Sequence, residues 1–289
     1  MILASNLDEV YRVCDPDKPL SADDERYIDL SEVRGTKVLA TKIARRISRC
    51  DSSQCHQQLI TGHRGCGKST ELLRLKKELE QQQFFVVYID TEELLDLVDL
   101  DYLDVMLSIA KQTEEELRRA GIFLSETLLG DISDWFAEKI TESTQNTGIS
   151  GTLKTEAEAG TKIPFFASLM AKLTAEIKTA SSRKTTTRQK LKQEQAVFTA
   201  RLNNLLLDAR HKVQARNHKD LVLIVDGLEK MHYETLSDGQ STHNRLFVQH
   251  AEQLKAPQCH IIYTMPISLA YNANLGNDFD TPEVIPMVK

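Results

Sequence analysis

One stretch of the chain combines glycines, a lysine and hydroxyl groups at a spacing that suits phosphate binding. Between an apolar run and a helix-like run the sequence reads Gly62, His63, Arg64, Gly65, Cys66, Gly67, Lys68, Ser69 and Thr70. This is the pattern G-x-x-x-x-G-K-[ST], in which glycines bring backbone N–H groups against phosphate oxygens and the next helix points its positive end at them. Lys68 would reach the β- and γ-phosphates, and the Ser69 hydroxyl would ligate Mg²⁺. We expect the whole stretch to bind a nucleoside triphosphate.

A second acidic landmark follows a buried strand. Residues 221–225 are all apolar, Asp226 comes next, and Glu229 lies three residues further on. A carboxylate at the C-terminal end of a strand lies beside such a loop and can hold the water shell of Mg²⁺. The second carboxylate can orient or deprotonate the attacking water. Asp226 could instead cap a turn, and Glu234 is the other candidate for the base.

Two more residues have a chemical and a structural interpretation. Thr264 ends a later apolar strand and would read the γ-phosphate if that strand lies between the other two. Otherwise it packs there or caps Pro266. Cys66 could block nucleotide binding when oxidised, or it could simply fill space, since thiol reactivity needs a lowered pKa. No motif selects guanine, so adenine is the expected base.

Apolar patterns predict the elements that position these residues. Apolar runs, as expected of buried parallel strands, cover about 57–61, 84–90, 221–226, 259–264 and 283–288. Helical spacing covers about 38–49, 69–82, 100–120, 125–140, 187–216 and 242–254.

The composition changes between residues 141 and 164, where Thr, Ser, Gly and Glu dominate. We interpret 141–200 as an insertion, a short hairpin or disordered loop followed by helices. It divides the core into a first part, 27–140, and a second part, 201–289. Residues 1–26 are acidic and contain helix-breaking prolines, so we expect an arm lying on the domain.

Charge and cysteine content restrict the partners and the compartment. A net charge of −6 and a pI near 5.8 do not suggest a protein that coats nucleic acid. Five cysteines without framework spacing indicate a reducing compartment, and no second ligand pair accompanies Cys50, Cys55 and His56 to make a zinc site. We find no signal peptide and no apolar run long enough to cross a bilayer. We therefore expect a cytoplasmic protein without a membrane partner.

With these motifs in place, the chain resembles P-loop ATPases of the STAND and AAA+ type, which include NACHT, KAP-like and Orc/Cdc6-like ATPases. The resemblance covers about Tyr27 to the end, apart from the insertion. It implies an α/β fold with a five-stranded parallel sheet ordered 5-1-4-3-2, helices on both faces, and ATP with Mg²⁺ as ligand.

The resemblance also assigns roles to residues. Lys68 and Ser69 correspond to the Walker A pair, Asp226 and Glu229 to the Walker B acids, and Thr264 to the sensor position. In many members a G-R-E-like element upstream touches the adenine or ribose. Arg34 and Gly35 occupy that place in reversed order.

Two departures from the family pattern affect the functional expectation. AAA+ rings usually carry an arginine finger after the sensor strand, and 267–289 contains no arginine. The sequence also stops where such families continue into a helical lid or winged-helix domain. We therefore expect this to be the N-terminal ATPase portion of a longer protein, whose further part would supply the lid and the effector or sensor.

Three functions remain open from the sequence. The first is a STAND-type switch that binds ATP, hydrolyses it slowly and acts on an unknown protein partner or C-terminal effector. The second is a DNA-associated AAA+ ATPase of the initiator or loader type, supported by the basic residues Lys37, Lys42, Arg45, Arg46 and Arg49 and by Arg183, Lys184, Arg188, Lys190 and Lys192. Such charges on a helix are usually only solvated. The third is an adaptor in which ATP has a purely structural role.

Overall fold

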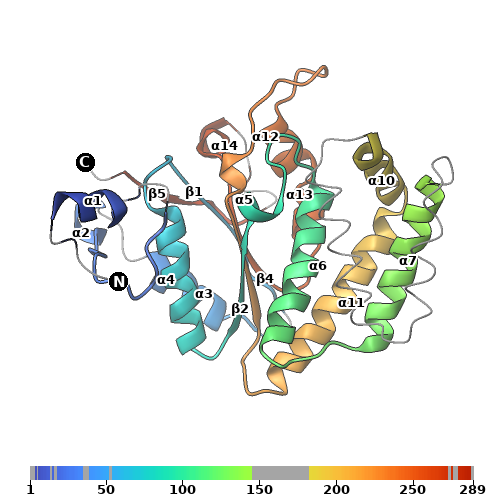
Figure 1. Cartoon of the computed structure of the whole chain (residues 1–289), viewed down its shortest axis with the longest axis horizontal. Helices are drawn as coiled ribbons and strands as arrows, with labels where there is room; N and C mark the ends of the chain where they lie inside the picture. The colour runs from blue at the N-terminus through green and yellow to red at the C-terminus, as the bar shows by residue number, and fades with distance from the viewer. Residues whose placement is uncertain are drawn as a thin grey trace.

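Five parallel strands form the centre of the structure, a computed structural model that describes residues 4, 6–13, 15, 18–34, 39–51, 54–144, 182–272, 275 and 279–287 (Figure 1). The strands are β1 (Gln57–Gly62), β2 (Phe85–Asp90), β3 (Leu221–Asp226), β4 (His260–Thr264) and β5 (Glu283–Ile285). Their order across the sheet is β2-β3-β4-β1-β5, and every pair is parallel. The expected order 5-1-4-3-2 is therefore confirmed.

The central positions of the strands are mostly apolar and buried because helices cover both faces of the sheet (Figure 1). One face packs against α3 (Leu39–Ser48) and α4 (Lys68–Gln81). The other face packs against α6 (Tyr102–Arg119), α11 (Gln195–Gln214) and α13 (Ala251–Lys255). All six residues of β3 are buried, as expected for a central strand.

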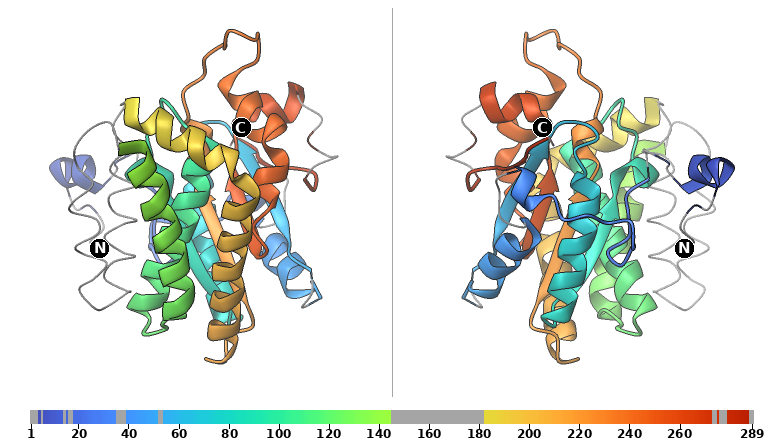
Figure 2. Two further views of the ribbon diagram at one scale, coloured as in Figure 1. Left: turned by 90° about the vertical axis from the view of Figure 1, so that its right-hand side faces the viewer. Right: turned by 90° about the vertical axis from the view of Figure 1, so that its left-hand side faces the viewer.

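The remaining elements are shorter or lie outside these layers. α7 (Glu126–Thr144) lies beside α11 on the outside of the molecule (Figure 2). The others are α1 (Leu7–Val13), α2 (Ser31–Arg34), α5 (Thr91–Leu94), a 3₁₀ turn η1 (Leu228–Lys230), α12 (Thr242–Asn244), a π-helical turn η2 (Arg245–Gln249) and α14 (Ile267–Asn272). No helix of the described residues is long and apolar enough to cross a bilayer.

The long helix predicted for 187–216 is two helices in the structure. α10 (Ser182–Gln193) ends before Glu194, which leaves helical geometry at φ −113° and ψ 32°, and α11 starts at Gln195. The Glu194 carboxylate accepts a hydrogen bond from Trp135 Nε1 at 2.9 Å, which holds the break against α7. The predicted hairpin, and residues 145–181 of the proposed insertion, lie outside the described residues.

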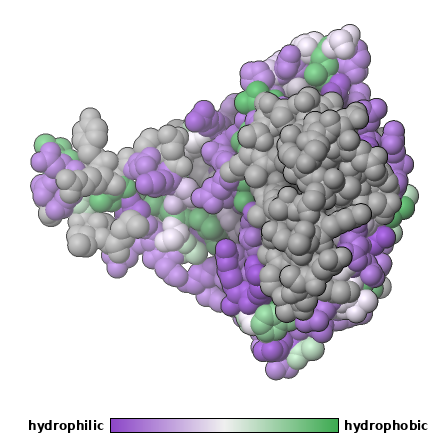
Figure 3. Space-filling view, turned by 45° about the vertical axis from the view of Figure 1, so that its right-hand side comes forward, coloured by the Kyte–Doolittle hydropathy of each residue, from purple (hydrophilic) through white to green (hydrophobic). Residues whose placement is uncertain are grey.

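The N-terminal residues project from the broad body as a narrow extension with exposed apolar side chains (Figure 3). Leu7 and Ile28 are among the exposed ones. The chain then runs along α4: Leu20 N donates to Thr70 Oγ1 at 3.2 Å, and Asp23 pairs with Lys77.

Arg188 fastens α10 to the start of α6. Its guanidinium donates to both carboxylate oxygens of Asp99 at 2.9 Å and to the buried carboxylate of Asp104. Lys192 adds a 2.6 Å contact to Asp101. Burial raises the pKa of Asp104 to about 6, and the hydrogen bond from Arg188 opposes that rise.

We expect Arg188→Ala to reduce the free energy of unfolding by about 3–5 kcal/mol at pH 8, because it leaves a buried carboxylate without its counter-charge. The pKa of Asp104 in the folded variant then rises further above that of the unfolded chain, so stability is lost as the pH rises. The loss should therefore shrink toward pH 5, where Asp104 becomes protonated.

Urea denaturation at both pH values measures this loss. Arg119→Ala is the control, because Arg119 is exposed and, among the described residues, pairs with Glu116 of its own helix, and it should cost less than about 0.5 kcal/mol. Equal losses for Arg188→Ala at the two pH values would contradict the role of Arg188 as the counter-charge of the buried Asp104 carboxylate.

Candidate functional site

The loop after β1 has the backbone that anion binding requires. Gly65 and Gly67 have φ of 79° and 88°, which side chains with a Cβ rarely adopt. Gly62 has no room for a side chain, since a Cβ there would lie 2.7 Å from Cys66 Sγ and from the Ile285 carbonyl oxygen. Gly67 is the N-cap of α4, so the unsatisfied N–H groups of the helix start open toward the loop.

Lys68 is buried in this loop and contacts the loop itself and one acid. Its Nζ donates to the carbonyl oxygens of Gly62 and His63, both at 3.1 Å, and lies 3.1 Å from Glu229 Oε1. The Glu229 side chain is only 10% exposed, and its Oε2 has no hydrogen-bond partner within the described residues. The predicted lysine and the predicted base therefore meet in one place.

Asp226, at the end of β3, lies beside the first turn of α4. The Ser69 side chain lies near its carboxylate and lowers its pKa. Tyr88 Oη donates to Oδ2 at 2.5 Å, and Gly227 N donates to Oδ1 at 2.8 Å. Burial and the charge of Glu229 raise the pKa of Asp226, while the nearby Ser69 side chain and the hydrogen bond from Tyr88 oppose this.

The side chains around Asp226 offer the kind of oxygen ligands that a hard cation such as Mg²⁺ prefers. A hydroxyl oxygen and a carboxylate from two separate elements lie side by side, and a second carboxylate, Glu229, is close enough to affect the charge of the first. Oxygen ligands of this kind suit Mg²⁺. The described residues contain no cluster of three or more His, Cys, Asp or Glu with metal-binding geometry. Ser69, Asp226 and the substrate's own phosphates would share the Mg²⁺ ion.

Thr264 lies where the strand order places it, at the end of β4 between β1 and β3. It is fully buried, and its Oγ1 accepts a hydrogen bond from Leu228 N at 3.1 Å. The threonine therefore supports the turn that carries Glu229. Because Thr264 Oγ1 only accepts in this contact, its hydroxyl hydrogen remains available to a γ-phosphate. The sensor role of Thr264 stays a prediction.

Arg34 contacts the loop from the N-terminal side. Its Nη2 donates to the Cys66 carbonyl oxygen at 2.6 Å, and its Nη1 lies 3.4 Å from Glu71 Oε1. Tyr27 Oη donates to the same Glu71 oxygen at 3.0 Å. The Arg34 Nε is buried with no partner among the described residues. Gly35, predicted to act with Arg34, lies outside the described residues.

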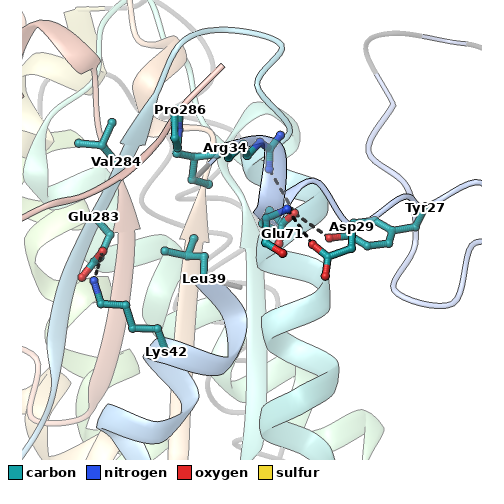
Figure 4. Close-up of a pocket in the computed structure, with 11 residues that line it drawn as sticks. Tyr27, Asp29, Arg34, Leu39, Lys42, Glu71, Glu283, Val284 and Pro286 are labelled. Atoms are coloured by element: carbon teal, nitrogen blue, oxygen red, sulfur yellow. Dashed lines mark hydrogen bonds and ion pairs between the residues drawn. The ribbon is translucent and has the colours of Figure 1, made fainter. Parts of the chain in front are cut away.

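A cavity of about 240 Å³ opens beside Arg34 (Figure 4). Arg34 and Glu71 form one side of it and the end of β5 forms the other. Its lining residues are Tyr27, Asp29, Ser31, Arg34, Leu39, Lys42, Glu71, Glu283, Val284, Ile285 and Pro286. Since Ile285 also touches Gly62 across the β1–β5 pair, the cavity adjoins the phosphate-binding loop.

The other predicted loop residues take three different positions. His63 and Arg64 are exposed at the tip of the loop. Thr70 is tied to the N-terminal segment through Leu20. Cys66 is buried, and burial raises the pKa of its thiol, which disfavours the thiolate that oxidation requires.

Sequence reasoning missed the contribution of β2. Asp90 ends β2 in register with Asp226, and burial raises the pKa of its carboxyl. The Thr91 hydroxyl donates to the Asp226 carbonyl oxygen at 2.8 Å. The signal was available for Asp90, which ends a buried strand as Asp226 does. Tyr88 lies two residues earlier and so points to the same face. The pair Tyr27 and Glu71 had no sequence signal.

Comparison with known proteins agrees with this site. The family model described as the KAP family P-loop domain matches residues 36–248, which include the loop, both acids and most of the core. Searches of curated proteins and of solved structures gave no match. The matched region covers well over half of the chain and contains the loop and the acids that meet at Lys68. The chain therefore belongs to the KAP family of P-loop NTPases.

Proposed function

We propose that this chain is the ATP-binding, slowly ATP-hydrolysing switch module of a STAND-type signalling or defence ATPase in the cytoplasm. The observation that carries the proposal is the 3.1 Å contact between Lys68 Nζ and Glu229 Oε1, with the Ser69 side chain near Asp226. A lysine, a hydroxyl and two acids from β1–α4 and β3 converge there, as hydrolysis of a phosphoanhydride requires.

The cavity supports ATP as the substrate. It adjoins the phosphate-binding loop, and Tyr27, Leu39 and Pro286 give it apolar surface for a base. Asp29, Ser31 and Arg34 supply polar groups for the ribose. Arg34 touches both the cavity and the loop, so a nucleotide would lie across it, as the predicted Arg34–Gly35 element requires.

Each site residue has a defined task in hydrolysis. Lys68 exchanges Glu229 and the loop carbonyl oxygens for the β- and γ-phosphates. Once released, Glu229 is free to orient a water and take its proton. Ser69 and Asp226 would hold Mg²⁺, which would neutralise charge on the phosphates. Thr264 holds the turn at Leu228 and is the candidate contact that senses the γ-phosphate.

The surroundings of the acids bear on both affinity and turnover. The Lys68–Glu229 ion pair must separate when ATP binds, and this separation lowers the affinity for ATP rather than the rate of the chemical step. None of the contacts described for Asp226 and Glu229 involves an arginine. We propose that a partner supplies the charge that stabilises the transition state, so that turnover by this chain alone is slow. The output would pass to a protein partner or an effector portion.

The DNA-associated alternative has less support. Lys42 and Arg46 of α3 pair with Glu283 at 2.7 and 2.8 Å, and Arg188 and Lys192 of α10 pair with acids of the α6 start. These cations therefore hold the fold together. DNA affinity that falls steeply with salt would favour the alternative.

Lys68→Ala should weaken ATP binding by about 100-fold or more, because it removes the cation that contacts the phosphates. Titration calorimetry with a non-hydrolysable ATP analogue measures the loss. Lys76→Ala is the matched control, since Lys76 lies on the same helix and its ion pair within the described part of the chain is with Glu80. Equal affinities for wild type and Lys68→Ala would contradict the proposal.

Glu229→Gln should keep ATP binding and reduce hydrolysis by about 10²–10⁴-fold, since the base is lost. Affinity should rise rather than fall, because the variant no longer holds Lys68 in an ion pair. Phosphate release and calorimetry on one preparation measure the two effects.

Glu234→Gln serves as the comparison for this experiment. Glu234 is exposed, and it was the other candidate for the base. Hydrolysis that is lost in Glu234→Gln and retained in Glu229→Gln would move the base to Glu234.

A further inference from the structure

Tyr88 directs a phenol from β2 into the site, although no motif includes it. Its ring packs against the core between the sheet and the α3–α4 layer, which fixes the position of the hydroxyl. That hydroxyl lies 2.5 Å from Asp226 Oδ2. A hydrogen bond to a carboxylate at this distance belongs to the strong, charge-assisted class.

The contact completes the fixation of the Asp226 carboxylate. Gly227 N holds Oδ1 at 2.8 Å, and this bond alone would leave Oδ2 free to rotate. With the Tyr88 hydroxyl bonded to Oδ2, both carboxylate oxygens are held. The carboxylate then cannot rotate about its Cβ–Cγ bond without breaking the hydrogen bond from Tyr88 or the one from Gly227. An ionised carboxylate has about four lone-pair positions. Tyr88 and Gly227 use two of them, so two remain for Ser69 and for a ligand or its water.

The backbone at Asp226 does not depend on Tyr88. β3 pairs with β2 through Asp226 itself, and Thr91 Oγ1 donates to its carbonyl oxygen at 2.8 Å. Thr91 also packs so tightly there that a Cβ on Gly227 would lie 2.7 Å from its Oγ1. The hydroxyl of Tyr88 therefore adds nothing to the position of the strand end and acts only on the carboxylate.

We propose that Tyr88 is a positioning residue of the metal site, which holds the Asp226 carboxylate toward Ser69 so that Mg²⁺ can strengthen nucleotide binding. The inference rests on the function proposed above. Tyr88 touches neither the nucleotide nor the reacting atoms and acts through Asp226.

Tyr88→Phe removes the hydroxyl and keeps the packed ring. The dissociation constant of a non-hydrolysable ATP analogue is measured with EDTA and again with Mg²⁺, and the ratio of the two gives the gain from the metal. In Tyr88→Phe the constant in EDTA should stay within about twofold of wild type. The gain from Mg²⁺ should fall about tenfold, as expected when a partner of a metal ligand is lost.

Two further variants separate positioning from general damage. Tyr102→Phe removes a hydroxyl that bonds Gln195 at 3.2 Å, remote from the site, and should leave the gain unchanged. In an Asp226→Asn background, Tyr88→Phe should cause no additional loss, because the two residues act as one unit.

The possible results separate the two proposals. An unchanged gain in Tyr88→Phe, or an equal loss of affinity with and without Mg²⁺, would overturn the role of Tyr88 and leave the proposed function intact. A wild-type chain that binds the nucleotide without any gain from Mg²⁺ would overturn the Mg²⁺-dependent function and the role of Tyr88 together.

Discussion

The proposed mechanism depends on one buried contact, in which the ammonium group of Lys68 meets the carboxylate of Glu229. Taking two charges out of water is costly, and a hydrophobic pair of the same volume is often as stable. The contact is therefore better explained by the positions that it gives to Lys68 and Glu229 than by a contribution to the free energy of unfolding. In the free form, Glu229 and the loop carbonyl oxygens occupy the lysine that phosphates would bind. In the proposed mechanism, the same contact would keep Glu229 neutralised until a ligand separates the pair.

The order of the strands makes this contact possible. β4 lies between β1 and β3, so the loop after β1 and the acids after β3 face each other across one strand. In sheets of this type ligands bind at the carboxyl ends of the strands, where the order of the chain reverses. At the same edge Thr264 supports the turn at Leu228, and β2 contributes Tyr88 and Thr91. Four neighbouring strands thus fix the positions of two carboxylates.

The main features of the fold could be predicted because they rest on local patterns. Continuous apolar runs predicted the strands, and the glycine spacing predicted the loop, since only particular residues permit those conformations. The resemblance to P-loop ATPases supplied the strand order. The break at Glu194 was missed because its cause is a tertiary contact with Trp135. The links of Tyr88 to Asp226 and of Tyr27 to Glu71 were also missed, since each joins residues far apart in the chain.

The most direct test of the central claim is a crystal structure of the chain with Mg²⁺ and a non-hydrolysable ATP analogue. The account predicts that Lys68 Nζ leaves Glu229 and the carbonyl oxygens of Gly62 and His63 to contact the β- and γ-phosphates. It also predicts the metal at Ser69 and Asp226. An analogue bound elsewhere, with the Lys68–Glu229 pair still closed, would contradict the account.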